Sequence, residues 1–112
     1  MSLSTHVLDT SAGRPAVGVA VRFESLGTEG SWTTVGSGKT DADGRLRDWL
    51  PVGVPGAGRH RLVFDTAAYF AALGVASFFP EVSVEFEITA AGEHHHVPLL
   101  LSPFGYSTYK GS

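Results

Sequence analysis

Apolar and polar residues alternate along several short stretches of the chain. The clearest stretch is 81–89, where apolar side chains occupy every second position, at Val82, Val84, Phe86 and Ile88. Such alternation is typical of a strand with one buried face. Because Gly, Pro, Asp and Ser cluster between the alternating stretches, as turns require, the pattern predicts seven or eight short strands. The weaker alternating stretches are residues 3–9, 19–24, 31–37, 59–65 and 94–101.

The stretch from Asp65 to Gly74 departs from this alternation. It is rich in alanine and carries an apolar stripe at Tyr69, Phe70 and Leu73. A capping aspartate at the start and a glycine at the end are helix boundary signals. We therefore predict one short helix in an otherwise all-β fold. Since no helix-length pattern separates the other strands, an antiparallel β-sandwich is favoured over a parallel sheet.

Length and composition fit a single domain over residues 1–112. Hydrophobic residues form 43% of the chain, enough for one core, and charged residues only 17%, against an average of about 25%. A surface so sparsely charged suggests contacts with partner subunits. The longest apolar tracts, such as 97–101, are far shorter than the roughly 18 residues of a membrane span, so no membrane partner is expected.

Net charge and cysteine content narrow the possible functions further. The formal charge is −3 and no stretch gathers basic residues, so nucleic acid is not expected as a partner. The lack of cysteine removes disulfides, thiolate nucleophiles and cysteine-based zinc sites. The chain opens without a basic and then apolar export signal, so we expect a cytoplasmic protein. Its chemistry must use the five histidines, the hydroxyls, the carboxylates and the few basic residues.

Three consecutive histidines begin the strand expected at 94–101. Alternation places His94 and His96 on one face of that strand and His95 on the other. Two neighbouring imidazoles can carry out general acid–base chemistry, or with His6 from the first strand they can form a three-histidine zinc site. They can equally lie on a solvated face without a function, and the spacing alone does not decide among the three.

The segment 41–45, Asp-Ala-Asp-Gly-Arg, predicts a tight turn centred on Asp43 and Gly44. It does not fit a calcium loop, because Leu50 stands where the bidentate glutamate is required. Arg45 begins the strand after the turn. Its guanidinium can hold a carbonyl or an oxyanion in a cleft, or lie at the surface without a specific role.

The last residues form a polar and aromatic segment, 106–112. They follow the apolar tract 97–101 after only a Ser-Pro-Phe-Gly turn, so they should run back as a paired, ordered strand rather than as a frayed end. The expected pairing would anchor Tyr106 and Tyr109.

Three segments carry distinctive motifs: 3–9 (LSTHVLD), 40–45 (TDADGR) and 94–112 (HHHVPLLLSPFGYSTYKGS). Together they resemble the transthyretin-related family of 5-hydroxyisourate hydrolases. The third segment, which joins a His-x-His-Val-Pro stretch to a Tyr-x-Gly-Ser end, is the most specific. Residue by residue, the family's catalytic constellation corresponds to His6, Arg45, His96 and the terminal tetrapeptide 109–112. Lys110 departs from the family's arginine, which keeps the charge but loses the bidentate geometry.

The resemblance implies a transthyretin-like (prealbumin-like) sandwich that opens the cyclic amide of 5-hydroxyisourate during urate breakdown. The product would be 2-oxo-4-hydroxy-4-carboxy-5-ureidoimidazoline, formed by histidine-activated water without a cofactor or metal. The implied catalytic residues are His6, Arg45, His96 and Ser112. The implied substrate-binding residues are His6, Arg45, Tyr109 and Lys110.

The resemblance also implies a homotetramer. Two sandwiches would join edge to edge and two such dimers would stack, with active sites along the channel between the dimers. The alternative function is that of a transthyretin-like carrier, which would hold a small aromatic molecule without turning it over.

Overall fold

Strands make up most of the computed structural model, which describes residues 2–90 and 92–112. Within these residues there are nine strands and one helix, and seven of the strands are four residues or longer. These seven correspond to the strands predicted from alternation and from the C-terminal segment. The elements are β1 (Ser2–Asp9), β2 (Arg14–Pro15), β3 (Ala20–Leu26), β4 (Trp32–Lys39), β5 (Arg45–Leu46), β6 (Gly58–Phe64), α1 (Thr66–Ala72), β7 (Val82–Ile88), β8 (His94–Ser102) and β9 (Gly105–Thr108).

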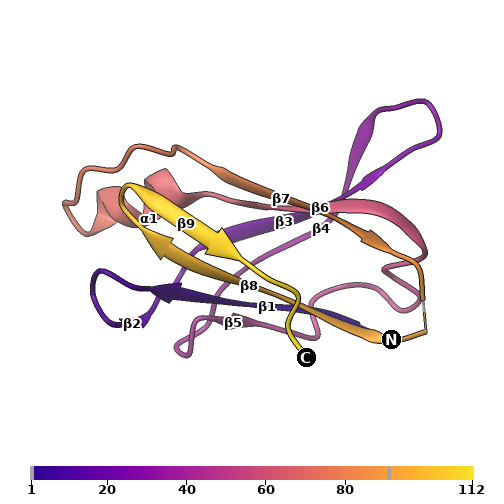
Figure 1. Cartoon of the computed structure of the whole chain (residues 1–112), viewed down its shortest axis with the longest axis horizontal. Helices are drawn as coiled ribbons and strands as arrows, with labels where there is room; N and C mark the ends of the chain where they lie inside the picture. The colour runs from indigo at the N-terminus through magenta and orange to yellow at the C-terminus, as the bar shows by residue number, and fades with distance from the viewer. Residues whose placement is uncertain (1, 91) are drawn as a thin grey trace.

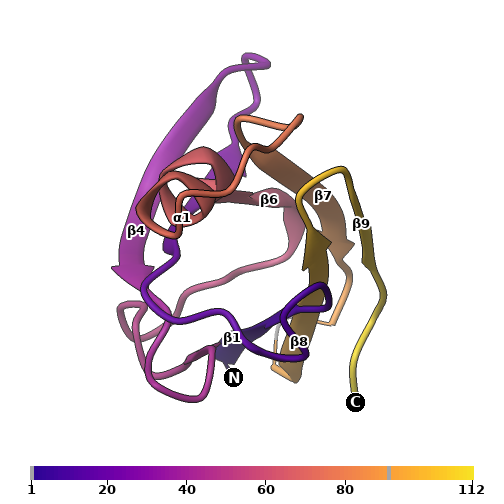
Figure 2. The ribbon, with the colours of Figure 1, turned by 90° about the vertical axis from the view of Figure 1, so that its left-hand side faces the viewer.

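The strands form two sheets (Figure 1). The first sheet has the order β2-β1-β8-β9, with β5 also paired to β1, and the second has the order β4-β3-β6-β7. Figure 2 views this sandwich from the end that carries α1. The prediction of a sandwich with one short helix is confirmed. One pair is not antiparallel, because β1 and β8 run in the same direction. The whole second sheet lies between them in the chain, so no short turn dictates their relative direction.

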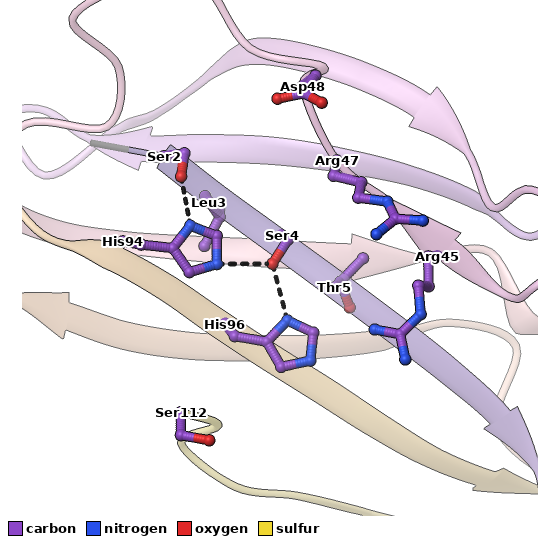
Figure 3. A pocket seen from close by; sticks show the side chains of 10 residues that line it. All are labelled: Ser2, Leu3, Ser4, Thr5, Arg45, Arg47, Asp48, His94, His96 and Ser112. Carbon is purple, nitrogen blue, oxygen red and sulfur yellow. Dashed lines mark hydrogen bonds between the residues drawn. The ribbon is translucent and has the colours of Figure 1, made fainter.

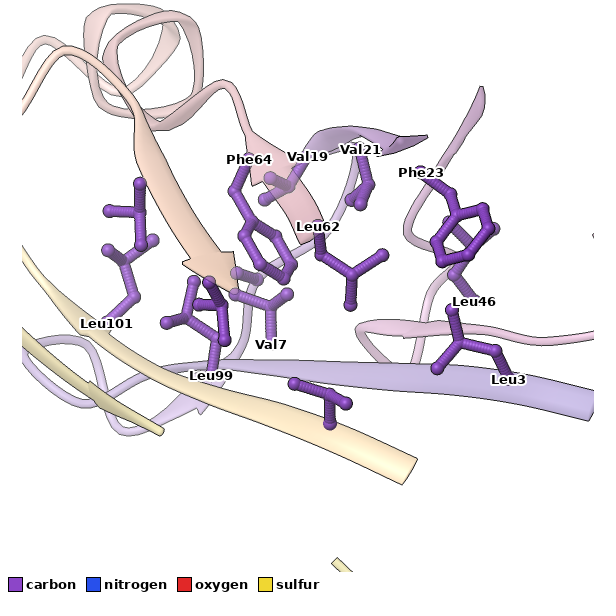
Figure 4. Close-up of a cluster of buried hydrophobic side chains, with 14 of the residues drawn as sticks. Leu3, Val7, Val19, Val21, Phe23, Leu46, Leu62, Phe64, Leu99 and Leu101 are labelled. Atoms are coloured by element: carbon purple, nitrogen blue, oxygen red, sulfur yellow. The ribbon is translucent and has the colours of Figure 1, made fainter. Parts of the chain in front are cut away.

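The core lies between the facing sides of the two sheets (Figure 4). Val7 and Leu99 enter it from the first sheet, while Phe23, Leu62 and Phe64 enter it from the second, and all five are fully buried. Side chains alternate across a strand, so the neighbours of Val7 and Leu99 in β1 and β8 must point outward. The same alternation that builds the core therefore turns polar residues outward at one end of the first sheet, at Ser4 and His96, and apolar residues outward at the other end, at Leu8 and Leu100.

Helix α1 begins as predicted, with the Asp65 carboxylate accepting a hydrogen bond from the backbone N–H of Ala68. Phe70 is buried in the core, but Leu73 is 46% exposed, so the predicted apolar stripe is wrong at that position. Leu73 follows the last helical turn, where the chain leaves the sandwich. In the parts of the chain that the structure describes, no helix is long and apolar enough to cross a membrane.

The C-terminal segment runs back along β8, as predicted. β9 pairs antiparallel with β8, from Leu99 opposite Thr108 to Ser102 opposite Gly105. The anchoring of the two tyrosines is confirmed only in part. Tyr106 packs edge-on against an aromatic ring of the loop after α1, whereas Tyr109 is 58% exposed.

Candidate active site

Three strands bring the predicted site residues to the outer face of the first sheet. In the parallel pair of β1 and β8, Ser4 lies opposite His96 and Ser2 lies opposite His94. In the antiparallel pair of β1 and β5, His6 lies opposite Arg45. The prediction that His94 and His96 share one strand face is confirmed, since both line the same cavity.

A cavity of about 360 Å³ opens on this face (Figure 3). Of the residues predicted from the sequence to be catalytic, Arg45, His96 and Ser112 line it. They come from β5, from β8 and from the end of the chain, so only the folded sandwich brings them together. The full lining is Ser2, Leu3, Ser4, Thr5, Arg45, Arg47, Asp48, His94, His96 and Ser112.

A tight turn holds Arg45 at this cavity. The Asp41 carboxylate accepts the backbone N–H groups of Arg45 at 2.9 Å and of Asp43 at 2.8 Å, and these bonds lower the pKa of Asp41. Gly44 has a φ of 75° and accepts the Val7 N–H at 2.8 Å, which joins the turn to β1. A Cβ at Gly44 would lie 2.5 Å from the Val7 carbonyl oxygen, so only glycine fits there.

His96 is half-buried at the centre of the cavity. Its Nδ1 lies 2.8 Å from the Ser4 hydroxyl, while Figure 3 shows the other ring nitrogen turned away from Ser4. Burial lowers the pKa of His96, and electrostatic interactions with Arg45, His6 and His94 lower it further. At neutral pH the ring is therefore an unprotonated imidazole, which is the form that can accept a proton.

His6 lies beside this cavity rather than in its lining. It shares the outer face with Arg45, its pairing partner, but its Nε2–H donates to the Asp43 carbonyl oxygen at 3.0 Å. That bond leaves Nδ1 as the nitrogen with a free lone pair. The structure thus brings His6 close to the other predicted residues and commits one of its ring nitrogens to the turn.

The terminal tetrapeptide is divided between two cavities. Gly111 donates its N–H to the His96 carbonyl oxygen at 2.8 Å, and this bridge puts Ser112 at the cavity of Arg45. Tyr109 and Lys110 instead line a second cavity of about 310 Å³ beside β7. Within one chain, therefore, these two predicted substrate-binding residues are not in the same cavity as Arg45.

Five polar residues at the cavity lay outside both the predicted site and the predicted histidine pair: Ser2, Ser4, Thr5, Arg47 and Asp48. For the two serines a signal was available, because they alternate with His6 along one strand face. Arg47 and Asp48 lie in a loop, where alternation carries no information.

The hypothesis of a zinc site gains no support from the geometry. Among residues 2–90 and 92–112, no three histidine, aspartate or glutamate side chains are grouped so that they could hold a metal ion. The set proposed from the sequence was His6, His94 and His96. In the structure, both ring nitrogens of His94 and the Nδ1 of His96 face serine hydroxyls instead.

A family model described as "HIUase/Transthyretin family" matches residues 3–111. The chain belongs to this family. Among similar proteins in the family, the 5-hydroxyisourate hydrolase of Salmonella typhimurium is 47% identical over 110 residues, covering 98% of this chain and 80% of that protein. The resemblance inferred from the three sequence segments is thereby confirmed.

Solved structures of the HIUase/Transthyretin family share the fold. The Klebsiella pneumoniae 5-hydroxyisourate hydrolase superposes with a TM-score of 0.86 at 39% identity, covering 100% of both chains. The sea bream transthyretin in complex with thyroxine superposes with a TM-score of 0.92 at 34% identity, covering 97% of this chain and 93% of that one. Both confirm the transthyretin-like sandwich. Because both resemble this chain closely, the fold does not distinguish hydrolase from carrier.

Proposed function

We propose that this protein is a 5-hydroxyisourate hydrolase of urate degradation. The observation that carries the proposal is the arrangement of His96, a neutral imidazole with one nitrogen free, beside the guanidinium of Arg45 in one cavity. Relatives named as 5-hydroxyisourate hydrolases, at 47% identity in Salmonella typhimurium and 42% in Mus musculus, support the same substrate. The reaction is hydrolysis of the cyclic amide to the 4-carboxy-5-ureidoimidazoline product.

Water is the nucleophile in the proposed reaction. The free nitrogen of His96 takes a proton from the water as its oxygen attacks the amide carbonyl. The same nitrogen then returns a proton to the ring nitrogen that leaves, so the C–N bond breaks without forming an unstable amide anion. A general base of this kind contributes roughly a hundredfold to ten-thousandfold in rate.

Arg45 stabilises the charge that develops on the carbonyl oxygen. Its guanidinium is charged at all relevant pH values and donates in a planar fork, which suits an oxyanion and the neighbouring carbonyls of the substrate. Ser112 supplies a hydroxyl to the cavity of His96, and we assign it to orienting the water. We assign His6 to substrate contact at the rim, where its Nδ1 accepts a hydrogen bond from a substrate N–H.

We further propose a cytoplasmic homotetramer in which the cavities face a channel between two dimers. Low overall charge and the open face of the first sheet support this assembly. In it, Tyr109 and Lys110 contact substrate from the end of the chain, with the ammonium group of Lys110 acting as a point charge. Analytical ultracentrifugation over a range of concentrations tests the assembly, and a monomer at all concentrations would contradict it.

The direct test is the ultraviolet decay of freshly prepared 5-hydroxyisourate. Wild-type protein should accelerate the decay, and His96→Ala should reduce the turnover by about a hundredfold or more with little loss of stability. Wild-type activity should fall on acidification as His96 becomes protonated. Because the pKa of His96 is lowered, the midpoint of this fall should lie at a pH below the ordinary histidine pKa of about 6.5. Full activity in His96→Ala, or no acceleration by the wild type, contradicts the proposal.

A carrier function is the second candidate. The close superposition with a transthyretin that binds thyroxine favours it. The same decay assay separates the two functions, because a carrier binds an aromatic ligand measurably and leaves the decay of 5-hydroxyisourate unchanged. A zinc hydrolase is tested by elemental analysis and by activity in the presence of a chelator.

A further inference from the structure

A chain of hydrogen-bonding groups leads away from His96 along the surface of the first sheet. The Ser4 hydroxyl lies 2.8 Å from His96 Nδ1 and 3.1 Å from His94 Nε2. The Ser2 hydroxyl is hydrogen-bonded to His94 Nδ1 on the far side of that ring. Ser4 is 8% exposed whereas His94 is exposed, so the chain of groups runs along the cavity lining from a buried hydroxyl to a solvent-exposed ring (Figure 3).

The chemistry of one hydroxyl couples the two histidine rings. Ser4 has a single proton, so it can donate to only one of the two ring nitrogens that contact it and must accept from the other. If Ser4 donates to His94 Nε2, then His96 Nδ1 carries the proton and its Nε2 is free as a base. If Ser4 donates to His96 Nδ1, then His96 carries its proton on Nε2 and is an acid.

The parallel pairing of β1 with β8 produces this coupling. It places Ser2 beside His94 and Ser4 beside His96 on one face. Ser4 therefore lies within reach of both histidine rings. Since Ser4 is buried between two rings, few other partners can reach its hydroxyl. The two arrangements therefore differ only in where protons lie and need no movement of the backbone.

We propose that Ser4 and His94 form a proton relay that lets His96 alternate between base and acid while its ring stays neutral. This inference rests on the proposed hydrolysis. When His96 Nε2 takes a proton from the attacking water, its Nδ1 proton passes to Ser4, whose own proton passes to His94 Nε2. The Nδ1 proton of His94 then leaves through Ser2 to bulk water.

The second half of the reaction restores the starting arrangement. His96 Nε2 gives its proton to the leaving nitrogen, and Ser4 returns a proton to His96 Nδ1. His94 Nε2 supplies Ser4, and His94 Nδ1 regains a proton from solvent. Each proton that leaves the relay is replaced, so the relay is unchanged after one turnover. In the overall hydrolysis, water contributes its hydroxyl to the new carboxyl group and its proton to the leaving nitrogen.

The charges around His96 explain why such a relay helps. Arg45, Arg47 and His94 line its cavity and His6 lies nearby, with Asp48 as the acidic side chain of the lining. A positively charged imidazolium is unfavourable there, which agrees with the lowered pKa of His96. Passing a proton through Ser4 and His94 to solvent leaves both rings neutral and avoids that charge.

The test uses the full-length protein in the 5-hydroxyisourate decay assay. His94→Ala should lower kcat by about tenfold or more. Added imidazole should restore much of this loss, because both of its nitrogens exchange protons, whereas N-methylimidazole should not, because one of its nitrogens is blocked. The matched control is His95→Ala, on the opposite strand face, which should keep the wild-type kcat and show no effect of imidazole.

A second pair of variants tests Ser4. Ser4→Ala should lose about as much kcat as His94→Ala, and Ser4→Thr, which keeps the hydroxyl, should recover most of it. Wild-type kcat in both His94→Ala and Ser4→Ala, or equal rescue by imidazole and N-methylimidazole, overturns the relay. If wild-type protein itself does not accelerate the decay, the proposed function fails instead, and the two failures are thereby distinguished.

A measurement without substrate keeps the inference testable if Ser4→Ala folds poorly. Nitrogen-15 correlation spectra report which nitrogen of each histidine carries the proton. His94→Ala replaces an exposed side chain and leaves the buried Ser4 in place. The relay requires that this variant change the tautomer populations of His96. Unchanged His96 tautomers contradict the coupling.

Discussion

At the scale of single residues, the end of the chain is fitted closely to His96. Gly111 hydrogen-bonds to the His96 backbone and lies against its ring. A Cβ built on Gly111 would be 2.5 Å from His96 Cδ2, which is closer than a real Cβ approaches, and 3.1 Å from the His96 carbonyl oxygen, which is a tight contact. The position of the proposed base thus depends on a residue that has no side chain.

Gly111→Ala should therefore reduce activity more than stability. The added methyl group would force the His96 ring to rotate or would break the hydrogen bond between the Gly111 N–H and the His96 carbonyl oxygen. Either change displaces the proposed base, which should lower kcat by roughly tenfold or more. Steady-state kinetics and a thermal unfolding curve measure the two effects. Gly92→Ala is the matched control, because nothing lies within 4 Å of its added Cβ. Wild-type kcat in Gly111→Ala would show that the bridge does not position His96.

At the scale of elements, a partly buried hydrogen bond ties α1 to the end of β1. The Tyr69 hydroxyl donates to the Asp9 carboxylate at 2.7 Å, and Asp9 is 2% exposed. Burial and this bond raise the pKa of Tyr69 to about 12. Burial alone would raise the pKa of Asp9, but bonds from Tyr69, Ser11 and Ala12 outweigh it and lower that pKa.

Tyr69→Phe should lower the free energy of unfolding by about 2 kcal/mol, since a buried carboxylate loses a donor. Urea unfolding at pH 7 measures the change. Tyr106→Phe serves as the control, because Tyr106 is partly exposed and its replacement should change stability by less than about 0.5 kcal/mol. Equal stability of the two variants would contradict the structural role of the bond.

The strands themselves were predictable, but their partners were not. Alternation marks each strand, because one face must be apolar, and Asp65 and Gly74 mark the helix. The two-residue strands β2 and β5 are too short for a periodic pattern. The parallel direction of β8 against β1 is set by how the sheets close around the core, which no local pattern encodes.

At the scale of the whole molecule, the two outer faces differ in chemistry. The outer face of the first sheet carries the candidate active site, whereas the second sheet carries a network of ion pairs. Its centre is Glu24, 6% exposed, which accepts from Arg22 at 2.7 Å, from Arg61 at 2.6 Å and from Thr34 at 3.0 Å. Substitutions in this ion-pair network should therefore change the stability of the fold without changing the candidate active site.

Glu24→Gln should lower the free energy of unfolding at pH 7 by about 2 kcal/mol and leave kcat unchanged. Burial raises the pKa of Glu24, but the bonds from Arg22, Arg61 and Thr34 outweigh it and hold that pKa below the usual 4.5. The stabilisation by Glu24 is therefore complete above about pH 4.5 and is lost as the pH falls through the lower, folded value.

Urea unfolding at pH 7, 5 and 3 checks this prediction. The gap in stability between wild type and Glu24→Gln should persist at pH 5 and shrink toward pH 3. A gap that stays constant over that range would mean that the charge of Glu24 does not stabilise the fold.

By itself, the sequence determined the local structure and the residue types available for chemistry. Alternation, capping and turn signals act between near neighbours, so they can be read without the fold, and the terminal motif led through resemblance to Arg45, His96 and Ser112. Only the tertiary structure decided which groups meet. It joined Ser4 to His94 and His96 and separated Tyr109 and Lys110 from Arg45, because contacts between distant strands follow from the packing of a shared core.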